Sequence, residues 1–156
     1  MINLINESMK LELNVSELYR LFHNNFPDDA TFWWDLVIEE RNHAELIRQG
    51  REHYEPKGKF PDSLLCSKLS ELQRVNEELA VLISEVTVNP LPREVAFNTA
   101  LKLELAVGEM HFQQFMNNDI ATTPEEIFKE LNSADKDHAE RILKYMNEKS
   151  IKVRYS

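Results

Sequence analysis

The sequence predicts an all-α protein: a four-helix bundle of two helical hairpins, with an additional helix that crosses from one hairpin to the other. Three observations lead to this prediction. Apolar residues recur at spacings of three and four along several long segments, as on the buried face of a helix. Only 3 glycines and 6 prolines interrupt 156 residues. Two short motifs also occur twice in the same order, which indicates two related hairpins.

The first repeated motif is an acidic residue three positions before a histidine. It occurs at Glu40 and His43, and again at Asp135 and His138. Positions three apart share one face of a helix, so the carboxylate and the imidazole of each copy point the same way. Each copy is therefore a candidate metal-chelating pair.

The second repeated motif lies upstream of each acid-x-x-His copy. Residues 10–17 match residues 102–109 at six of eight positions, which places Glu12 and Glu104 at equivalent positions among apolar neighbours. Each predicted hairpin thus supplies one isolated glutamate and one acid-x-x-His pair.

The first hairpin is predicted from a helix over 7–24 and a helix over about 30–54. Pro27 ends the first, and Asp28 or Asp29 is suited to cap the second. The inward positions of the two helices are apolar apart from Glu12 and Glu40, with His43 at the edge of the face. They comprise Leu11, Val15, Leu18, Tyr19 and Phe22, then Trp33, Val37, Ala44 and Ile47.

A Pro- and Gly-containing linker over 54–61 precedes the predicted crossover helix, 63–86. Its apolar stripe is narrow, so it fits either the chain's own bundle or a helix of a partner. The second hairpin is predicted from a helix over 92–117 and a last helix from a capping box at 123–126 to about 148. The last helix should turn Ile127, Leu131 and Ile142 inward. Residues 149–156 are predicted as a tail, and 1–156 as a single domain.

The candidate ligands stand at matching levels. Glu12 is about twelve residues before the first turn and Glu40 about eleven after it, so both lie roughly 17 Å from that turn. Glu104 and Asp135 match in the same way in the second hairpin. A bundle would therefore collect four carboxylates and two imidazoles in one layer. Buried carboxylates need compensating positive charge, and this set of nitrogen and oxygen donors suits two iron or manganese ions.

This ligand set resembles that of the ferritin-like di-iron carboxylate proteins. Within them the chain is similar to the rubrerythrin family, in an ordered pattern that spans nearly its whole length. The matching residues are Glu12 with Tyr19 seven later, Glu40-Arg41-Asn42-His43-Ala44, Glu104, and Asp135-Lys136-Asp137-His138-Ala139.

The resemblance implies a role for each residue. Glu12 and Glu104 would be terminal metal ligands, Glu40 and Asp135 would bridge the two metals, and His43 and His138 would bind one metal each. Tyr19 would donate a hydrogen bond behind the ligands, although its alternative role is that of a core residue.

Three residues depart from the rubrerythrin pattern, and the rubredoxin module is also missing. His111, which the repeat relates to Tyr19, is too far along a regular helix to bind the same metal as Glu104. Asp135 is shorter than the glutamate expected at a bridging position. Val107 stands where many rubrerythrins have an additional glutamate. The single cysteine, Cys66, excludes a rubredoxin module, which needs four. Electrons would therefore have to come from a separate protein.

Composition limits the remaining function classes. The net charge of −9 argues against nucleic-acid binding, and no signal peptide or membrane span is evident, so we expect a cytoplasmic protein. Three functions remain: an oxidoreductase that reduces peroxide or oxygen with two iron ions (or manganese), a non-catalytic iron-binding bundle, and a metal-free helical interaction module. A homodimer is compatible with each.

Overall fold

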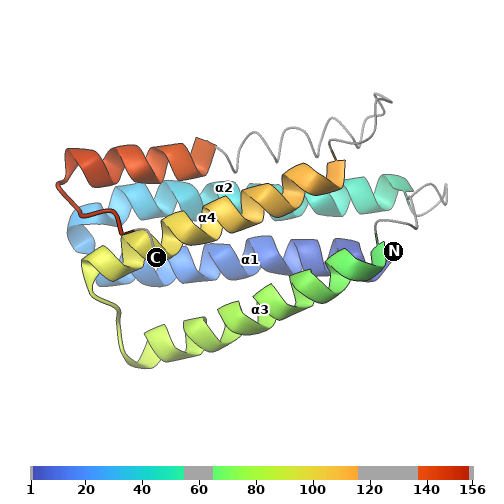
Figure 1. Ribbon diagram of the computed structural model, residues 1–156, viewed down its shortest axis with the longest axis horizontal. Helices are drawn as coiled ribbons and strands as arrows, with labels where there is room; N and C mark the ends of the chain where they lie inside the picture. The colour runs from blue at the N-terminus through green and yellow to red at the C-terminus, as the bar shows by residue number, and fades with distance from the viewer. Residues whose placement is uncertain (1, 55–64, 116–136, 155–156) are drawn as a thin grey trace. The chain divides into compact units, whose positions relative to one another are not determined.

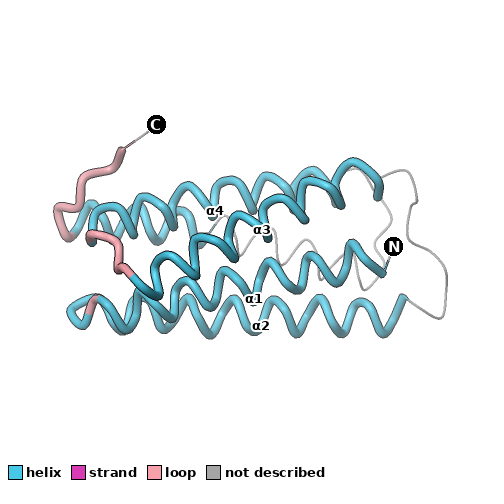
Figure 2. Tube along the Cα trace, turned by 90° about the horizontal axis from the view of Figure 1, so that it is seen from below, coloured by secondary structure: helices cyan, strands magenta, loops and turns pink. Residues whose placement is uncertain are grey.

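The computed structural model describes residues 2–54, 65–115 and 137–154. These residues form α1 (Ile2–Asn25), the 3-10 turn η1 (Pro27–Asp29), α2 (Ala30–Tyr54), α3 (Leu65–Val88) and α4 (Arg93–Phe115), and residues 137–148 are also helical (Figure 1). The described ranges contain no strand (Figure 2). The predicted all-α class is therefore confirmed.

The chain divides into two compact units, Met1–Pro90 and Leu91–Ser156. The first contains α1, α2 and α3, and the second contains α4 and the helix over 137–148. Each predicted acid-x-x-His motif falls in a different unit. The four-helix topology and the single domain remain predictions.

In the first unit, α1 and α2 pack against each other across the short turn η1. The bounds of α2 are those predicted, whereas α1 begins at Ile2 instead of residue 7. The reason is that Ile5 and Ser8 are buried, which continues the inward face of α1 toward the N-terminus. All the apolar side chains predicted to face inward on these two helices are buried.

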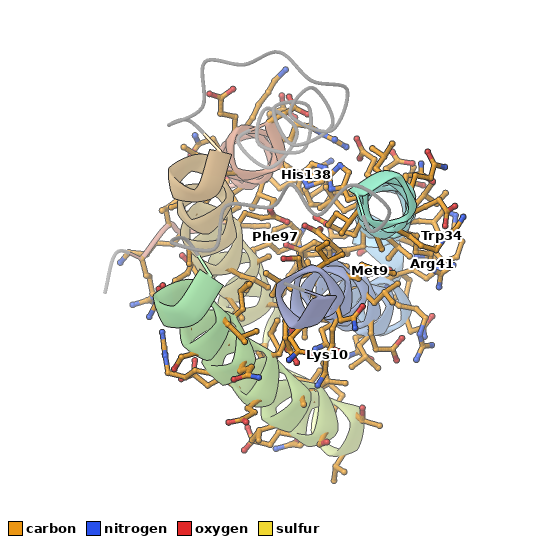
Figure 3. All side chains as sticks on the ribbon, turned by 90° about the vertical axis from the view of Figure 1, so that its right-hand side faces the viewer. Met9, Lys10, Trp34, Arg41, Phe97 and His138 are labelled. Atoms are coloured by element: carbon orange, nitrogen blue, oxygen red, sulfur yellow. The ribbon has the colours of Figure 1, made fainter. Side chains whose placement is uncertain are left out.

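An aromatic cluster fills the end of this hairpin near the turn. Tyr19 and Trp33 are fully buried, with ring centroids 5.4 Å apart, and Phe22 lies 5.0 Å from Trp33 in an edge-on arrangement. The neighbouring Trp34 is on the outer side of α2, where the Arg41 guanidinium lies 5.7 Å from its ring centroid (Figure 3). The buried rings fix how closely α1 and α2 approach at this end.

The crossover helix α3 packs along α1. Its buried stripe is Leu72, Leu79 and Val86, with Asn76 buried among them. The Asn76 amide donates to the backbone carbonyl of Glu7 at 2.9 Å and to the Glu7 carboxylate at 2.8 Å. Its oxygen accepts from Asn14 at 3.1 Å. Because a buried amide must be satisfied, these bonds set the level of α3 on α1.

In the second unit, buried side chains of α4 include Phe97, Ala100 and Leu101. From the helix over 137–148 they include Ile142 and Met146. The predicted linker over 54–61, the capping box at 123–126, Ile127, Leu131 and Asp135 lie outside the described residues, apart from Tyr54 at the end of α2. None of the described helices has an apolar stretch long enough to cross a membrane.

Candidate metal centre

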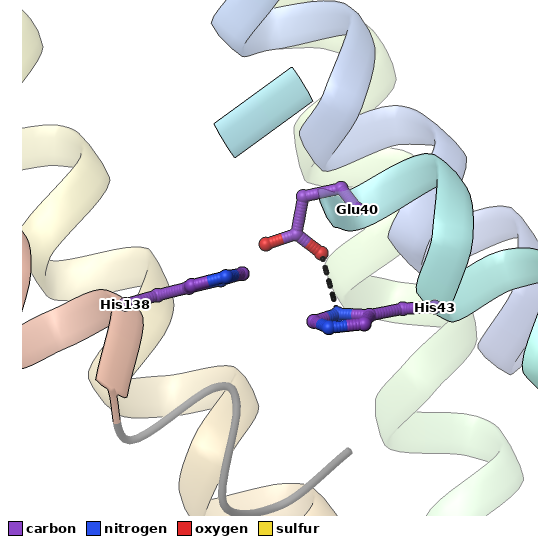
Figure 4. Close-up of side chains that lie close together, drawn as sticks. All are labelled: Glu40, His43 and His138. Carbon is purple, nitrogen blue, oxygen red and sulfur yellow. Dashed lines mark ion pairs between the residues drawn. The ribbon is translucent and has the colours of Figure 1, made fainter. Parts of the chain in front are cut away.

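In the first unit, Glu12 from α1 meets Glu40 and His43 from α2. The two carboxylates are 0% and 1% exposed and the histidine 6%. Nδ1 of His43 lies 3.3 Å from Oε2 of Glu40 and 3.6 Å from Oε2 of Glu12. Figure 4 shows the Glu40–His43 pair, whose common direction follows from their i,i+3 spacing on α2.

A hydrogen bond one turn from these side chains fixes the two helices at this level. The Ser16 hydroxyl, one turn beyond Glu12, donates to the backbone carbonyl of Val37 at 3.2 Å. Val37 in turn stands three residues before Glu40. The carboxylates of α1 and α2 are therefore held at the same height, as the level argument from the sequence predicted.

The separations within this group suit ligands of one metal ion. Two donor atoms that each lie about 2.1 Å from a metal, at tetrahedral or octahedral angles, are themselves about 3.0–3.4 Å apart. The distances of 3.3 Å and 3.6 Å from Nδ1 of His43 are at this range or slightly beyond it. Metal ligands bind in their deprotonated form, in which two carboxylates and one imidazole would together carry a charge of −2 that a divalent cation would balance.

The second unit repeats the arrangement with Glu104 of α4 and His138. Glu104 is 2% exposed and His138 is completely buried. Nδ1 of His138 lies 3.6 Å from Oε1 of Glu104, the same separation as that between His43 and Glu12 in the first unit. The internal repeat in the sequence thus reappears as a repeated side-chain geometry.

Glu40, His43 and His138 each offer a buried metal-binding atom, and Figure 4 draws the three side chains. Asp135, the predicted bridging partner of His138, lies outside the described residues. Tyr19 packs against Trp33 and Phe22, as expected of a core residue, and its role as a hydrogen-bond donor behind the ligands remains a prediction. Sequence reasoning missed Ser16, because a serine in a helix usually bonds locally and carries no periodic signal.

Comparison of the chain with family models, with curated proteins and with solved structures finds no match. The resemblance to rubrerythrins therefore rests on the motif residues themselves.

Proposed function

We propose that the chain is a di-metal carboxylate protein that reduces peroxide or oxygen with electrons from a separate donor protein. Glu12, Glu40 and His43 of the first unit would hold one metal ion. Glu104, Asp135 and His138 of the second unit would hold the other, with Glu40 and Asp135 shared between the two. Iron is the metal expected first, with manganese as the alternative.

One observation carries the proposal: both units bury a histidine whose Nδ1 lies 3.6 Å from a glutamate of a different helix. Burying one such pair is a common structural solution. Two buried histidine–glutamate pairs, at positions related by the sequence repeat, indicate that both pairs serve the same chemistry. In the deprotonated form that binds metal, buried carboxylates and imidazoles are ligands suited to a divalent cation, which supports a metal-binding role for both units.

Two bound ferrous ions would supply the two electrons which, with two protons from solvent, reduce one peroxide molecule to two water molecules. The protein's own side chains determine the conditions of that chemistry. The carboxylates neutralise the metal charge, and their burial limits the access of bulk water to the ligands. Within each unit, the described histidine and glutamate donor atoms already lie 3.3–3.6 Å apart, which would limit their reorganisation on metal binding.

The test starts with protein purified without an affinity tag, whose iron and manganese content is measured by mass spectrometry. The ferrous-loaded protein is then oxidised by peroxide and by oxygen in a stopped-flow instrument. We expect two metal ions per chain and faster oxidation by peroxide. Glu40→Gln should lose metal, whereas Glu45→Gln, on the exposed side of the same helix, should retain it.

Each other result points to a different function. Metal binding without turnover would indicate a non-catalytic iron-binding bundle. Protein that takes up no iron or manganese under anaerobic conditions would indicate a metal-free helical module and would overturn the proposal.

A further inference from the structure

The last described residues of the chain fold back onto α4. After the helix over 137–148, the N–H of Ile151 donates to the Met146 carbonyl at 2.8 Å, and that of Ser150 donates to Asn147 at 3.3 Å. Ser150 is left-handed, with φ 57°. This is a Schellman-type helix end. It reverses the chain and buries Ile151 next to the core.

The side-chain amide of Asn98 on α4 binds the backbone of the returning segment. Its amide nitrogen donates to the Lys152 carbonyl at 2.8 Å, and its oxygen accepts from the Arg154 N–H at 2.7 Å. The Arg154 guanidinium pairs with Glu94, one turn earlier on α4. We call Glu94, Asn98 and residues 150–154 the C-terminal clasp. Of the clasp, residues 150–154 belong to the segment predicted as a tail, 149–156.

An aromatic stack lies beside the clasp. The rings of Phe97 and Tyr145 are 5.6 Å apart and nearly parallel, at 13°. Arg93 lies 5.7 Å from the centroid of Phe97, and Lys149 lies 5.6 Å from that of Tyr145. The stack therefore joins the first turns of α4 to the end of the last helix, at the place where the clasp also joins them.

The stack and the metal-binding pair are related by helix geometry. Phe97 is seven residues before Glu104, and Tyr145 is seven residues after His138. Seven residues are two turns, or about 10.5 Å, and return to nearly the same face. A rotation of the last helix that separates the two rings would therefore also turn His138 away from Glu104.

We propose that the clasp fixes the rotation and level of the last helix against α4, so that Asn98 is a positioning residue for the metal held by His138. Along the chain, α4 is connected to this helix only through residues 116–136. At the other end of the helix pair, the clasp supplies the connection. The inference rests on the proposed function for its metal, but the clasp itself lies wholly within the second unit.

Asn98→Ala removes both contacts with the returning segment and also the amide's bond to the Glu94 carbonyl of its own helix. Thr99→Ala is the matched control, because it too removes a side-chain bond to a carbonyl one turn earlier. Thr99 is the next residue on α4 and half-buried, and among the described residues its hydroxyl donates to the Val95 carbonyl of its own helix. Manganous ion is titrated calorimetrically into each variant at a temperature where circular dichroism shows full helicity. We expect Asn98→Ala to weaken one of two binding steps about tenfold, the lower end for groups that orient ligands. The other step, and both steps in Thr99→Ala, should match the native protein. A chain that ends at Lys149 should behave like Asn98→Ala.

Unchanged binding steps in a protein of lowered melting temperature would show that Asn98 is purely structural, and the proposal would be overturned. Equal weakening of both binding steps would also overturn the proposal, because it would show that the substitution destabilises the whole protein and not the position of His138.

A second measurement separates this inference from the proposed function. Histidine-selective NMR of the metal-free protein reports the ring environment of each histidine. Asn98→Ala should shift the signals of His138 and leave those of His43 in place. If the native protein binds no metal, the proposed function fails and this spectrum still tests the clasp. Unmoved His138 signals would refute it.

Discussion

Nδ1 of His138 lies 3.6 Å from Oε1 of Glu104, on a different helix of the second unit. The first unit contains the same relationship between His43 and Glu12. In both cases the histidine is buried and presents Nδ1 to the carboxylate of a different helix. A side chain that only fills space has no reason to repeat its polar geometry, so the pairs point to ligand binding.

Removing either histidine should abolish stabilisation by metal. A metal that binds only the native state adds roughly 2.7 kcal/mol at a hundredfold excess over its dissociation constant. We expect ferrous or manganous ion to raise the melting temperature of the native protein under anaerobic conditions. The rise should be lost in His43→Ala and in His138→Ala. His23→Ala is the control, because His23 contacts the Ala30 carbonyl near the turn and should leave the rise intact. If neither metal ion changes the melting temperature of the native protein, the chain has no working metal site.

Asn76 should be the most sensitive polar position of the crossover helix. Asn76→Ala removes its contacts with Glu7 and Asn14 and leaves the half-buried polar groups of these two residues less satisfied. We expect a loss of about 2–3 kcal/mol in the free energy of unfolding, measured with urea. Arg74→Ala, on the exposed side of the same helix, should cost at most about 0.5 kcal/mol. Equal effects of the two substitutions would mean that Asn76 does not set the level of α3.

The pair of Glu17 and Arg20 should make a small, acid-sensitive contribution. The hydrogen-bonded Arg20 guanidinium lowers the pKa of Glu17 below its usual 4.5. The native state therefore favours the ionised form. Its stabilisation is complete above the usual pKa and is lost as the pH falls through the lowered one. Because the two side chains are 39% and 42% exposed and solvent screens the pair, Glu17→Gln should cost less than about 1 kcal/mol at neutral pH.

The measurement for this pair is urea unfolding from about pH 7 to about pH 3. The difference between native protein and Glu17→Gln should shrink toward acid. A double-mutant cycle with Arg20→Gln isolates the pair from other effects. A difference that grows as the pH falls would contradict the assignment.

Replacing Ser150 with glycine should stabilise the protein. Its φ of 57° is left-handed, where a side chain is strained and glycine is not. Ser150→Gly should raise the free energy of unfolding by about 0.5–1 kcal/mol. Ser84→Gly, at an exposed position inside α3, should instead lower it by about 0.5 kcal/mol. Urea unfolding of both variants tests the opposite signs, and a loss of stability in Ser150→Gly would contradict the Schellman-type end.

The sequence was most informative where a pattern repeats along a helix. The bounds of α2 were predicted from the turn residues before it and the linker after it. Helical spacing placed the five described ligand candidates on or beside the inward faces, with His43 at the edge, and all five are buried: Glu12, Glu40, His43, Glu104 and His138. The clasp was not predicted, since Asn98 bonds to an extended backbone segment more than fifty residues away, and such pairing leaves no periodic trace. Asn76 was detectable only as a gap in an apolar stripe. Its partners depend on how α3 lies on α1, which the stripe does not specify.

The last prediction concerns Asp135, the only one of the six predicted ligands outside the described residues. Aspartate lacks one methylene of glutamate, so its carboxylate ends roughly 1.5 Å short. In a dinuclear site the metals stand about 3.5–4 Å apart, and a bridging carboxylate must reach both. A short bridge should favour the metal at His138, three residues further along the chain, and leave the metal at His43 more weakly bound. The native protein should therefore bind two manganous ions with unequal affinities.

Asp135→Glu restores the reach and should tighten the weaker step in a calorimetric titration. Asp137→Glu is the matched control: it adds the same methylene two residues away, at an exposed position paired with Arg141. It should leave both steps as they are in the native protein. Because an added methylene in a packed core can cost about 1–3 kcal/mol, the stability of each variant is measured first. Two equal and tight sites in the native protein would show that Asp135 already bridges both metals, since only a bridge that reaches both ions leaves neither of them weaker.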